Sequence, residues 1–398
     1  MSPSVWIVGA ARTPIGRYGG TLASVHPSEL GAVAARAAMS RAQVNPSWID
    51  ETFMGHARQA GSGPNPARQV GQRAGLPDTV PATTVNKACA SGMEAVAAGG
   101  RQILLGESHV VLAGGIESMS RMPYLLDASD ARWGHRMGHF PLVDAMYRDG
   151  FTCSLCGMVM GETAELLARE YGISREASDA FALASHEKAA RAIAEGAFTD
   201  EIAPVEIPMP KGTQVLKADE HPRTTTAEGL AKLSSVFALD GVPGIITPGT
   251  SSGITDGGAA VVLASDDAVE HRGLQPMARV LGWASAGVDP RRMGIGPVPA
   301  VQRLLSQLSL ALDDFELVEL NEAFAPQVLA VLRDLPIDDR RLNVHGGAIA
   351  LGHPIGCTGT RILVTLVYAL KRHRLRRGLA TLCVSGGMGM AMAVELTA

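Results

Sequence analysis

Residues 82–115 read ATTVNKACASGMEAVAAGGRQILLGESHVVLAGG, and this stretch decides the fold. A short run with β-branched residues at 82–86 precedes a small-residue segment at 89–105, and a second apolar run follows at 110–113. These features are typical of a strand, a helix and a second strand, the repeating unit of layered α/β proteins. The stretch therefore predicts an α/β fold, with Cys89 at the junction between the first strand and the helix.

Similar units occur on both sides of this stretch, and they predict more strands and helices. The further strands are expected at 5–10, 51–57, 259–264, 277–283, 316–320, 380–384 and 390–396, and the further helices at 28–42, from Asn65-Pro66, from Val298, from Glu322 and at 362–372. The pattern breaks between about residues 118 and 247, where two helices are expected, near 162–171 and from the capping residue Ser174 to 196, before an irregular segment rich in proline. A weak similarity between 86–115 and 357–387 suggests a duplicated unit with an insertion.

Composition limits the class of protein further. The chain has 398 residues, of which 45 are glycine, 46% are hydrophobic and only 4% are aromatic, so two or three domains with a large core are expected. The net charge of 35 − 39 = −4 provides no broad basic field, so we expect no nucleic-acid partner. No apolar run approaches the roughly 18 residues of a membrane span. With no signal peptide recognised and five cysteines, too few for a disulfide framework, we expect a cytoplasmic protein.

Three side chains could carry nucleophilic chemistry. A helix N-terminus would lower the pKa of the Cys89 thiol, although a buried packing cysteine is the commoner case. His353 lies at the centre of the glycine-dense stretch 346–359, which is expected to form a loop and where the histidine could accept a proton from a cysteine. Cys383 ends an expected strand and leads into the glycine turn 385–389, whose backbone N–H groups could face an anion.

Asn321 follows another expected strand, at the end where open α/β sheets place ligands. Together these segments resemble the thiolase family. Other matching stretches are 10–16, 59–69, 115–120, 160–165 and 293–297, in consistent order up to Val394.

The resemblance implies a thiolase fold, a duplicated five-layered αβαβα core with an inserted loop domain that contacts coenzyme A. The N-terminal half would comprise residues 1–117 plus 248–268, the loop domain 118–247 and the C-terminal half 269–398. Family members are dimers or tetramers, so a homodimer or homotetramer is expected.

The resemblance also implies the roles of the site residues. Cys89 would be the acylated nucleophile, His353 the base that deprotonates it, and Cys383 the second acid/base. Asn321 would hold a water in one oxyanion hole together with His353, and the backbone N–H groups of Cys89 and Ser385 would form the other hole. The expected coenzyme A contacts are Arg223, Ser252, Phe324, Met160 and Met293. No metal is expected, and coenzyme A and acyl-CoA would be substrates and not cofactors.

The implied reaction is ping-pong acyl transfer through an acyl-cysteine. A 3-oxoacyl-CoA is cleaved with CoA to acetyl-CoA and a shortened acyl-CoA, or acetyl-CoA condenses in reverse. The degradative direction is favoured, with a biosynthetic acetoacetyl-CoA thiolase as the alternative. An acyl-phosphopantetheine condensing enzyme is a rival that typically has histidine at the position of Cys383, and a non-catalytic acyl-CoA-binding protein is a remote alternative.

Four positions depart from the family pattern. Ser385 replaces a glycine, Thr250 an asparagine, Val159 a histidine of many short-chain members, and Cys357 a frequent alanine.

Two further sequence patterns point to other chemistry. Cys153-x-x-Cys156 suggests zinc or redox chemistry, but no second pair exists at ligand spacing, so we interpret it as an inert loop pair. Residues 249–253 match the Gly-x-Ser-x-Gly pattern of serine hydrolases but lack the flanking strand and helix.

Overall fold

A computed structural model describes residues 3–397. Its central feature is one continuous ten-stranded sheet in the order β14-β15-β16-β13-β1-β12-β5-β3-β4, with the short β2 paired to β12. The strands of the first half are β1 (Val5–Arg12), β2 (Gly16–Arg17), β3 (Glu51–His56), β4 (Ala82–Val85), β5 (Val110–Ser118) and β12 (Thr255–Ala264), and those of the second half are β13 (Ala278–Gly287), β14 (Leu317–Leu320), β15 (Arg377–Val384) and β16 (Met388–Leu396). The halves are joined where Val5–Ile7 of β1 pairs antiparallel with Ala278–Val280 of β13.

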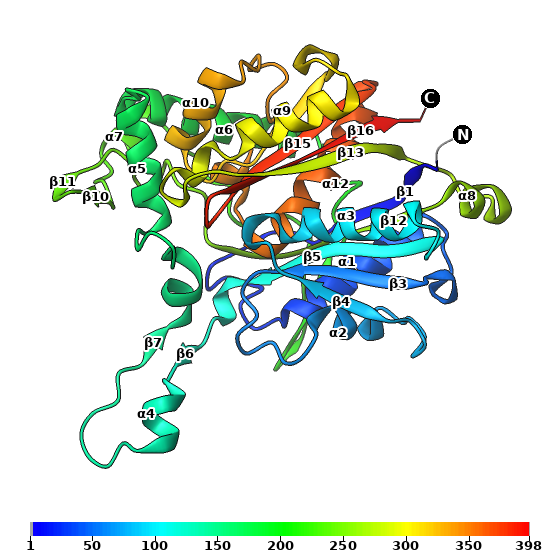
Figure 1. Cartoon of the computed structure of the whole chain (residues 1–398), viewed down its shortest axis with the longest axis horizontal. Coiled ribbons are helices and arrows are strands. Elements are labelled where there is room, and N and C mark those ends of the chain that lie inside the picture. Colours follow the sequence, from blue (N-terminus) through cyan, green and yellow to red (C-terminus); the bar gives the residue numbers. More distant parts are fainter. Residues whose placement is uncertain (1–2, 398) are drawn as a thin grey trace.

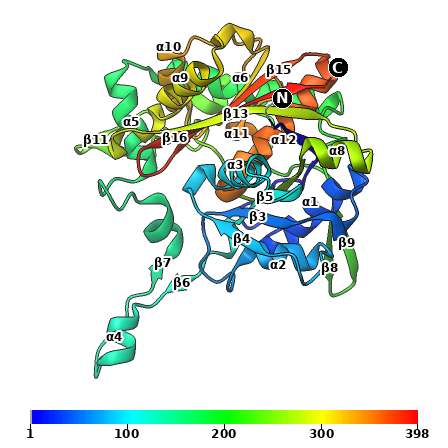
Figure 2. The same cartoon turned by 45° about the vertical axis from the view of Figure 1, so that its right-hand side comes forward.

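Helices cover both halves of the sheet and fill the space between them, as Figures 1 and 2 show. Helices α3 (Ser91–Leu104) and α12 (Ile355–His373) share one apolar core with strands of both halves. Helices α1 (Pro27–Arg41) and α2 (Pro66–Arg73) pack on the outer face of the first half. Helices α9 (Pro297–Leu308) and α10 (Ala325–Asp334) pack on the outer face of the second half. The predicted five-layered α/β fold is confirmed.

The glycine-dense stretch 346–359 is in part helical, which corrects the prediction of a loop. It contains α11 (Ala348–Leu351) and the first turn of α12, which begins at Ile355 and not at residue 362. Glycine usually weakens a helix, but here α12 lies so close to its neighbours that a side chain does not fit. A Cβ on Gly359 would lie 2.4 Å from the backbone nitrogen of Met93 in α3. Tertiary packing therefore overrides the low helix propensity.

The expected insertion lies between β5 and β12. Strands β6 (Tyr124–Leu125) and β7 (Val143–Asp144) and helix α4 (Ala128–Trp133) form an arm that projects from the layers in both views (Figures 1 and 2). The two expected helices are present as α5 (Met160–Glu170) and α6 (Arg175–Ala194), and Ser174 caps the second. The remaining strands and α-helices are β8 (Val205–Met209), β9 (Gly212–Leu216), α7 (Ala227–Ala231), β10 (Ala238–Leu239), β11 (Val242–Pro243) and, after the insertion, α8 (Asp266–Arg272).

The prediction of an irregular segment after residue 196 is wrong in one part, because β8 and β9 form a hairpin. Pro208 lies within β8, opposite Thr213, in a two-stranded ribbon where proline is tolerated because no further strand needs its missing N–H. The residue limits expected for the halves and the insertion stay predictions. Among residues 3–397, no helix is long and apolar enough to cross a bilayer.

Candidate active site

Cys89 lies on a tight 3-10 turn, Ala88–Ala90, between β4 and α3. Its neighbour Ala88 has a φ of 45°, a left-handed conformation that is uncommon for a residue with a side chain. Ser91 holds the turn, since its Oγ accepts from the backbone N–H of Lys87 at 2.9 Å and donates to the carbonyl of Ala88 at 2.6 Å. The helix itself begins at Ser91, two residues later than predicted. The strained backbone at Ala88 is a feature for which the sequence carries no signal.

Burial raises the pKa of the Cys89 thiol. The backbone N–H of Ser385, the charge of Arg58 and the N–H of Cys89 itself act in the opposite direction but do not outweigh burial. The prediction that the helix start lowers this pKa is therefore wrong, because desolvation of the thiolate raises the pKa by more than the nearby donors lower it. In the protein alone, Cys89 is a thiol that needs a base.

His353 is held in one orientation and, by its contacts, in one tautomer. Its backbone N–H donates to the carbonyl of Gly253 at 3.0 Å, and its Nδ1 lies 2.6 Å from Oγ1 of Thr358. The Thr358 hydroxyl donates its single hydrogen to the carbonyl of Pro354 at 2.9 Å. Nδ1 must therefore carry the proton and donate, which leaves Nε2 as an acceptor.

The charge state of His353 agrees with this tautomer. The side chain is 7% exposed, and burial, then Arg361 and Arg58, lower its pKa to about 3. The imidazole is thus neutral near pH 7, with a free lone pair on Nε2. Thr358 was missed by sequence reasoning; a hydroxyl five residues after the histidine was the available signal, and it was a weak one.

Asn321 follows β14 directly and is 1% exposed. Its backbone N–H donates to the carbonyl of Thr381, but both polar atoms of its side-chain amide have no hydrogen-bond partner among the described residues. Unpartnered buried amides are rare, because each unmet group costs about 1–3 kcal/mol. The Asn321 side chain is therefore suited to a water or a ligand that enters the site.

Cys383 lies near the end of β15 and is 1% exposed. Burial and the nearby Cys89 raise the pKa of its thiol far above the ordinary range, so the structure brings the two predicted cysteines together. The turn that follows contains Gly386 and Gly387, whose φ angles of 88° and 82° suit glycine. Ser385 begins this turn and directs its backbone N–H toward Cys89.

A cavity of about 500 Å³ lies at His353, and Cys89, Cys383 and Asn321 are not part of its lining. Its lining includes His353 and three of the five expected coenzyme A contacts, Met160, Ser252 and Phe324. Met293 instead packs beside Cys383, behind this lining.

Arg223 is outside the lining, but its Nη1 lies 3.3 Å from Nε2 of His221, which does line the cavity. The other lining residues are Arg17, Tyr18, Met119, Tyr147, Phe151, Val159, Gly161, Val236, Phe237, Pro248, Ser251, Gly253, Ile254 and Ile355.

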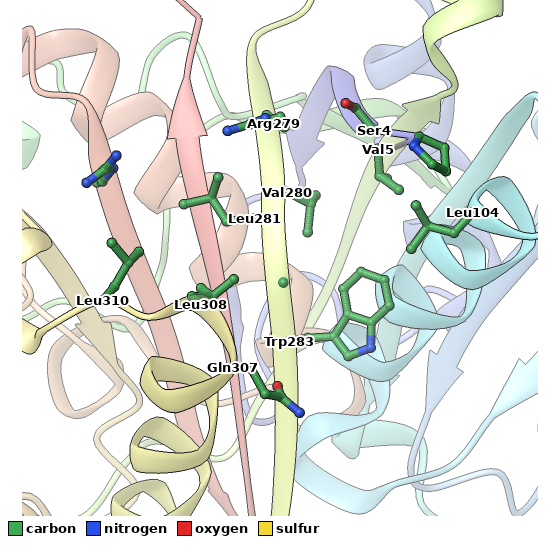
Figure 3. A pocket seen from close by; sticks show the side chains of 13 residues that line it. Ser4, Val5, Leu104, Arg279, Val280, Leu281, Trp283, Gln307, Leu308 and Leu310 are labelled. Carbon is green, nitrogen blue, oxygen red and sulfur yellow. The ribbon is translucent and has the colours of Figure 1, made fainter. Parts of the chain in front are cut away.

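A second cavity, of about 590 Å³, lies where the two halves of the sheet join (Figure 3). Leu104, Trp283 and Leu308 line it, together with Arg279. Among the described residues that line it, none is a predicted site residue. In the same part of the chain, 3–397, no group of three or more His, Cys, Asp or Glu side chains is placed to hold a metal ion.

Two buried carboxylates hold the backbone around the site, and neither was assigned a role from the sequence. Glu117 accepts from the backbone N–H of Gly356 at 2.8 Å, which fixes the start of α12. Glu322 accepts from Ser185, from Asn343 and from the N–H of Ile349, which fixes α11. Both position the segment on either side of His353.

A half-buried thiol on a strained turn lies beside a second, buried thiol, and a neutral histidine lines a cavity. These groups define a cysteine-based site in a layered α/β protein. The family models agree with this class and narrow it. Residues 5–267 match the model of the thiolase N-terminal domain, and residues 274–396 match that of the thiolase C-terminal domain. The chain belongs to the thiolase family, and it is therefore an enzyme of the acyltransferase class.

Individual relatives are similar over nearly their whole length. The chain is 49% identical to an acetyl-CoA acetyltransferase of Escherichia coli over 390 residues, 98% of either chain. The crystal structure of the Bacillus anthracis acetyl-CoA acetyltransferase is 44% identical, with a TM-score of 0.96 over 100% of this chain and 99% of that one. The human mitochondrial 3-ketoacyl-CoA thiolase in complex with CoA is 42% identical, with a TM-score of 0.94 over 100% of this chain and 98% of that one.

Proposed function

We propose that the enzyme transfers acyl groups between coenzyme A thioesters through an acyl group on Cys89, and that it cleaves 3-oxoacyl-CoA with CoA. One observation carries the proposal: the half-buried thiol of Cys89 lies beside the buried thiol of Cys383, and a histidine with a free Nε2 lines a cavity. All four predicted catalytic groups are present, which favours turnover over a non-catalytic acyl-CoA-binding role.

In the first half-reaction, Nε2 of His353 takes the proton of Cys89, and the sulfur attacks the 3-oxo carbon. The negative charge on the carbonyl oxygen is stabilised by the backbone N–H groups of Cys89 and Ser385. The bond between the α and β carbons then breaks, and the acetyl-CoA enolate takes its proton from Cys383. The enolate oxygen is held by His353 and by a water on Asn321.

In the second half-reaction, Cys383 accepts the proton of an incoming CoA thiol, whose sulfur attacks the acyl group on Cys89. The acyl-CoA leaves, and the proton returns from His353 to Cys89. Each cysteine thus ends the cycle in its starting state, and no metal or added cofactor takes part.

The pantetheine arm would occupy the cavity, against Met160, Ser252 and Phe324, with Arg223 near the phosphates. The aromatic side chains of Tyr147 and Phe151 in the lining would pack against an acyl chain, which favours the degradative role. The printed names of the bacterial relatives favour the second candidate, condensation of two acetyl-CoA molecules. Thiolysis rates for 3-oxoacyl-CoAs of increasing chain length separate the two: activity confined to acetoacetyl-CoA would contradict the broader role.

We also propose that the enzyme is a cytoplasmic homo-oligomer. Its five cysteines are all free, as expected in a reducing compartment. The projecting arm exposes 80% of Trp133 and 89% of Met137, together with Leu142, an apolar surface that a second copy could cover. Light scattering on the protein and on a Trp133→Ser, Met137→Ser variant tests this, since a monomer in both cases would contradict it.

A further inference from the structure

Cys153 and Cys156 occupy a closed turn beside the active site, and the proposed reaction uses neither. The backbone N–H of Cys153 donates to Met158, and that of Gly157 donates to Cys153, each at 2.8 Å. The second bond closes a single helical turn, in which residues three apart lie on the same side with Cβ atoms about 5–6 Å apart. The two side chains lie close enough that each thiol affects the pKa of the other. A disulfide between them needs only a small local adjustment.

The two thiols differ in access and in acidity. Cys153 is 4% exposed, whereas Cys156 is only half-buried. Burial opposes ionisation of Cys153, but the N–H groups of Leu155, Cys156 and Gly386 and the Cys156 thiol outweigh it and hold its pKa below the ordinary value. Burial, Cys153 and Asp289 raise the pKa of Cys156. The accessible thiol can thus meet an outside reagent, and the more acidic one can complete the exchange.

We propose that Cys153 and Cys156 are a reversible modification site that forms an intramolecular disulfide by exchange with a low-molecular-weight disulfide, RSSR. The sulfur of Cys156 attacks RSSR, which forms a mixed disulfide and releases RSH. The thiolate of Cys153 then attacks the Cys156 sulfur and expels a second RSH. Two protein thiols are oxidised and one RSSR is reduced, and the protons of the thiols leave on the two RSH molecules. This replaces the interpretation of an inert loop pair.

The disulfide would act on the neighbouring active site, and this part rests on the proposed function. The N–H of Gly386 interacts with the Cys153 sulfur, and the preceding Ser385 directs its N–H toward Cys89. On the other side, Phe151 and Val159 flank the turn and line the cavity. A shift of the turn would therefore weaken one donor to the reacting carbonyl, which we expect to slow acylation of Cys89 by about three- to ten-fold.

Peptide mapping of the full-length enzyme tests the disulfide directly. Trypsin cleavage after Arg148 and Arg169 releases one peptide that contains both thiols and none of the other cysteines. After equilibration with oxidised and reduced glutathione, followed by alkylation, we expect this peptide to be two hydrogens lighter and unalkylated. Dithiothreitol should restore two alkylation sites. The Cys156→Ser variant should form no internal disulfide, and Cys357→Ala, a control outside the pair, should behave like the wild type.

Two results would overturn the proposal. If both thiols of the peptide are still alkylated after the oxidising buffer, and Cys89 is unmodified as well, then Cys153 and Cys156 are not a modification site. If the disulfide forms but the wild type and the Cys156→Ser variant acylate Cys89 at equal rates in the oxidising buffer, the disulfide does not affect the active site. Loss of acylation in the reduced protein would instead contradict the proposed function, and the mapping result would be unaffected by it.

Discussion

Cys383 is buried and Cys89 is half-buried, and both thiols have a raised pKa, but their surroundings differ in ways that suit different tasks. Cys89 lies on a strained turn, and the backbone N–H of Ser385 points toward its sulfur. Cys383 lies near the end of a regular strand, and its own N–H is the single backbone donor that lowers its pKa. The strained turn with nearby N–H donors suits a nucleophile whose attack creates an oxyanion. The buried end of a strand suits a thiol that stays protonated until substrate binds.

The largest effect is expected at the proposed nucleophile. The Cys89→Ala variant should lose the covalent acetyl adduct formed with acetyl-CoA, and overall turnover should fall by at least about 10⁴-fold, since no other group can hold the acyl. Intact-protein mass spectrometry measures the adduct. Cys357→Ala, which replaces a buried cysteine of α12, is the matched control and should keep the adduct. An unchanged adduct in Cys89→Ala would exclude Cys89 as the nucleophile.

The Cys383→Ser variant should separate the two cysteines. A hydroxyl of similar size is a weaker acid, so protonation of the enolate should slow by about 10³-fold while acylation of Cys89 by acetyl-CoA persists. Thiolysis of acetoacetyl-CoA and the acetyl adduct are measured side by side. Equal loss of both would contradict an acid/base role that is specific to Cys383.

Asn321 should affect catalysis without affecting stability. Because its amide makes no hydrogen bond with described residues, Asn321→Ala should lower kcat by about 10²-fold and leave the melting temperature nearly unchanged.

The adjacent Glu322 provides the contrast, because its carboxylate accepts three hydrogen bonds. The Glu322→Gln variant should lower the free energy of unfolding by about 1–3 kcal/mol. A large loss of stability in Asn321→Ala would indicate a structural role instead.

Thr358 should matter through the tautomer of His353. Thr358→Val keeps the shape of the side chain but removes the acceptor for Nδ1, so the proton is free to move to Nε2 and acylation should slow by about ten-fold. Thr358→Ser restores the hydroxyl and should restore the rate, which a purely structural role at this position would not require. Acylation rates from rapid-quench experiments, with KM reported separately, provide the measurement.

The sequence predicted the layers and the main chemical groups for physical reasons. Apolar periodicity and glycine turns are local, so β4, α3 and β5 were predicted within a few residues. The resemblance named Cys89, His353, Cys383 and Asn321, and the structure brings the two cysteines together. The direction of the Cys89 pKa was predicted wrongly, because the helix start is local but burial depends on the whole fold.

Other features were missed because they depend on contacts between distant segments. The early start of α12 depends on the close approach of Gly359 to the backbone of Met93, which is 266 residues earlier in the chain. The hydrogen bond that the backbone N–H of Gly356 donates to Glu117 likewise joins residues 239 apart. The left-handed Ala88 has no residue-type signal, since glycine or asparagine is expected there.

The smallest effect is expected from pH. Its measurement tests whether His353 is neutral and Cys383 is protonated in the resting enzyme. The pKa of His353 is lowered to about 3 from an ordinary value near 6.5, so acidification from pH 7 to 5 leaves the imidazole neutral. The rate of Cys89 acylation should change by less than about two-fold over this range, whereas a histidine with an ordinary pKa would lose roughly 20-fold. Circular dichroism at each pH confirms that the fold persists. At the alkaline end, the raised pKa of Cys383 keeps it protonated, so cleavage should show no loss up to pH 9. An acid limb near pH 6.5 would mean that His353 is more solvated than its burial and its contact with Thr358 indicate.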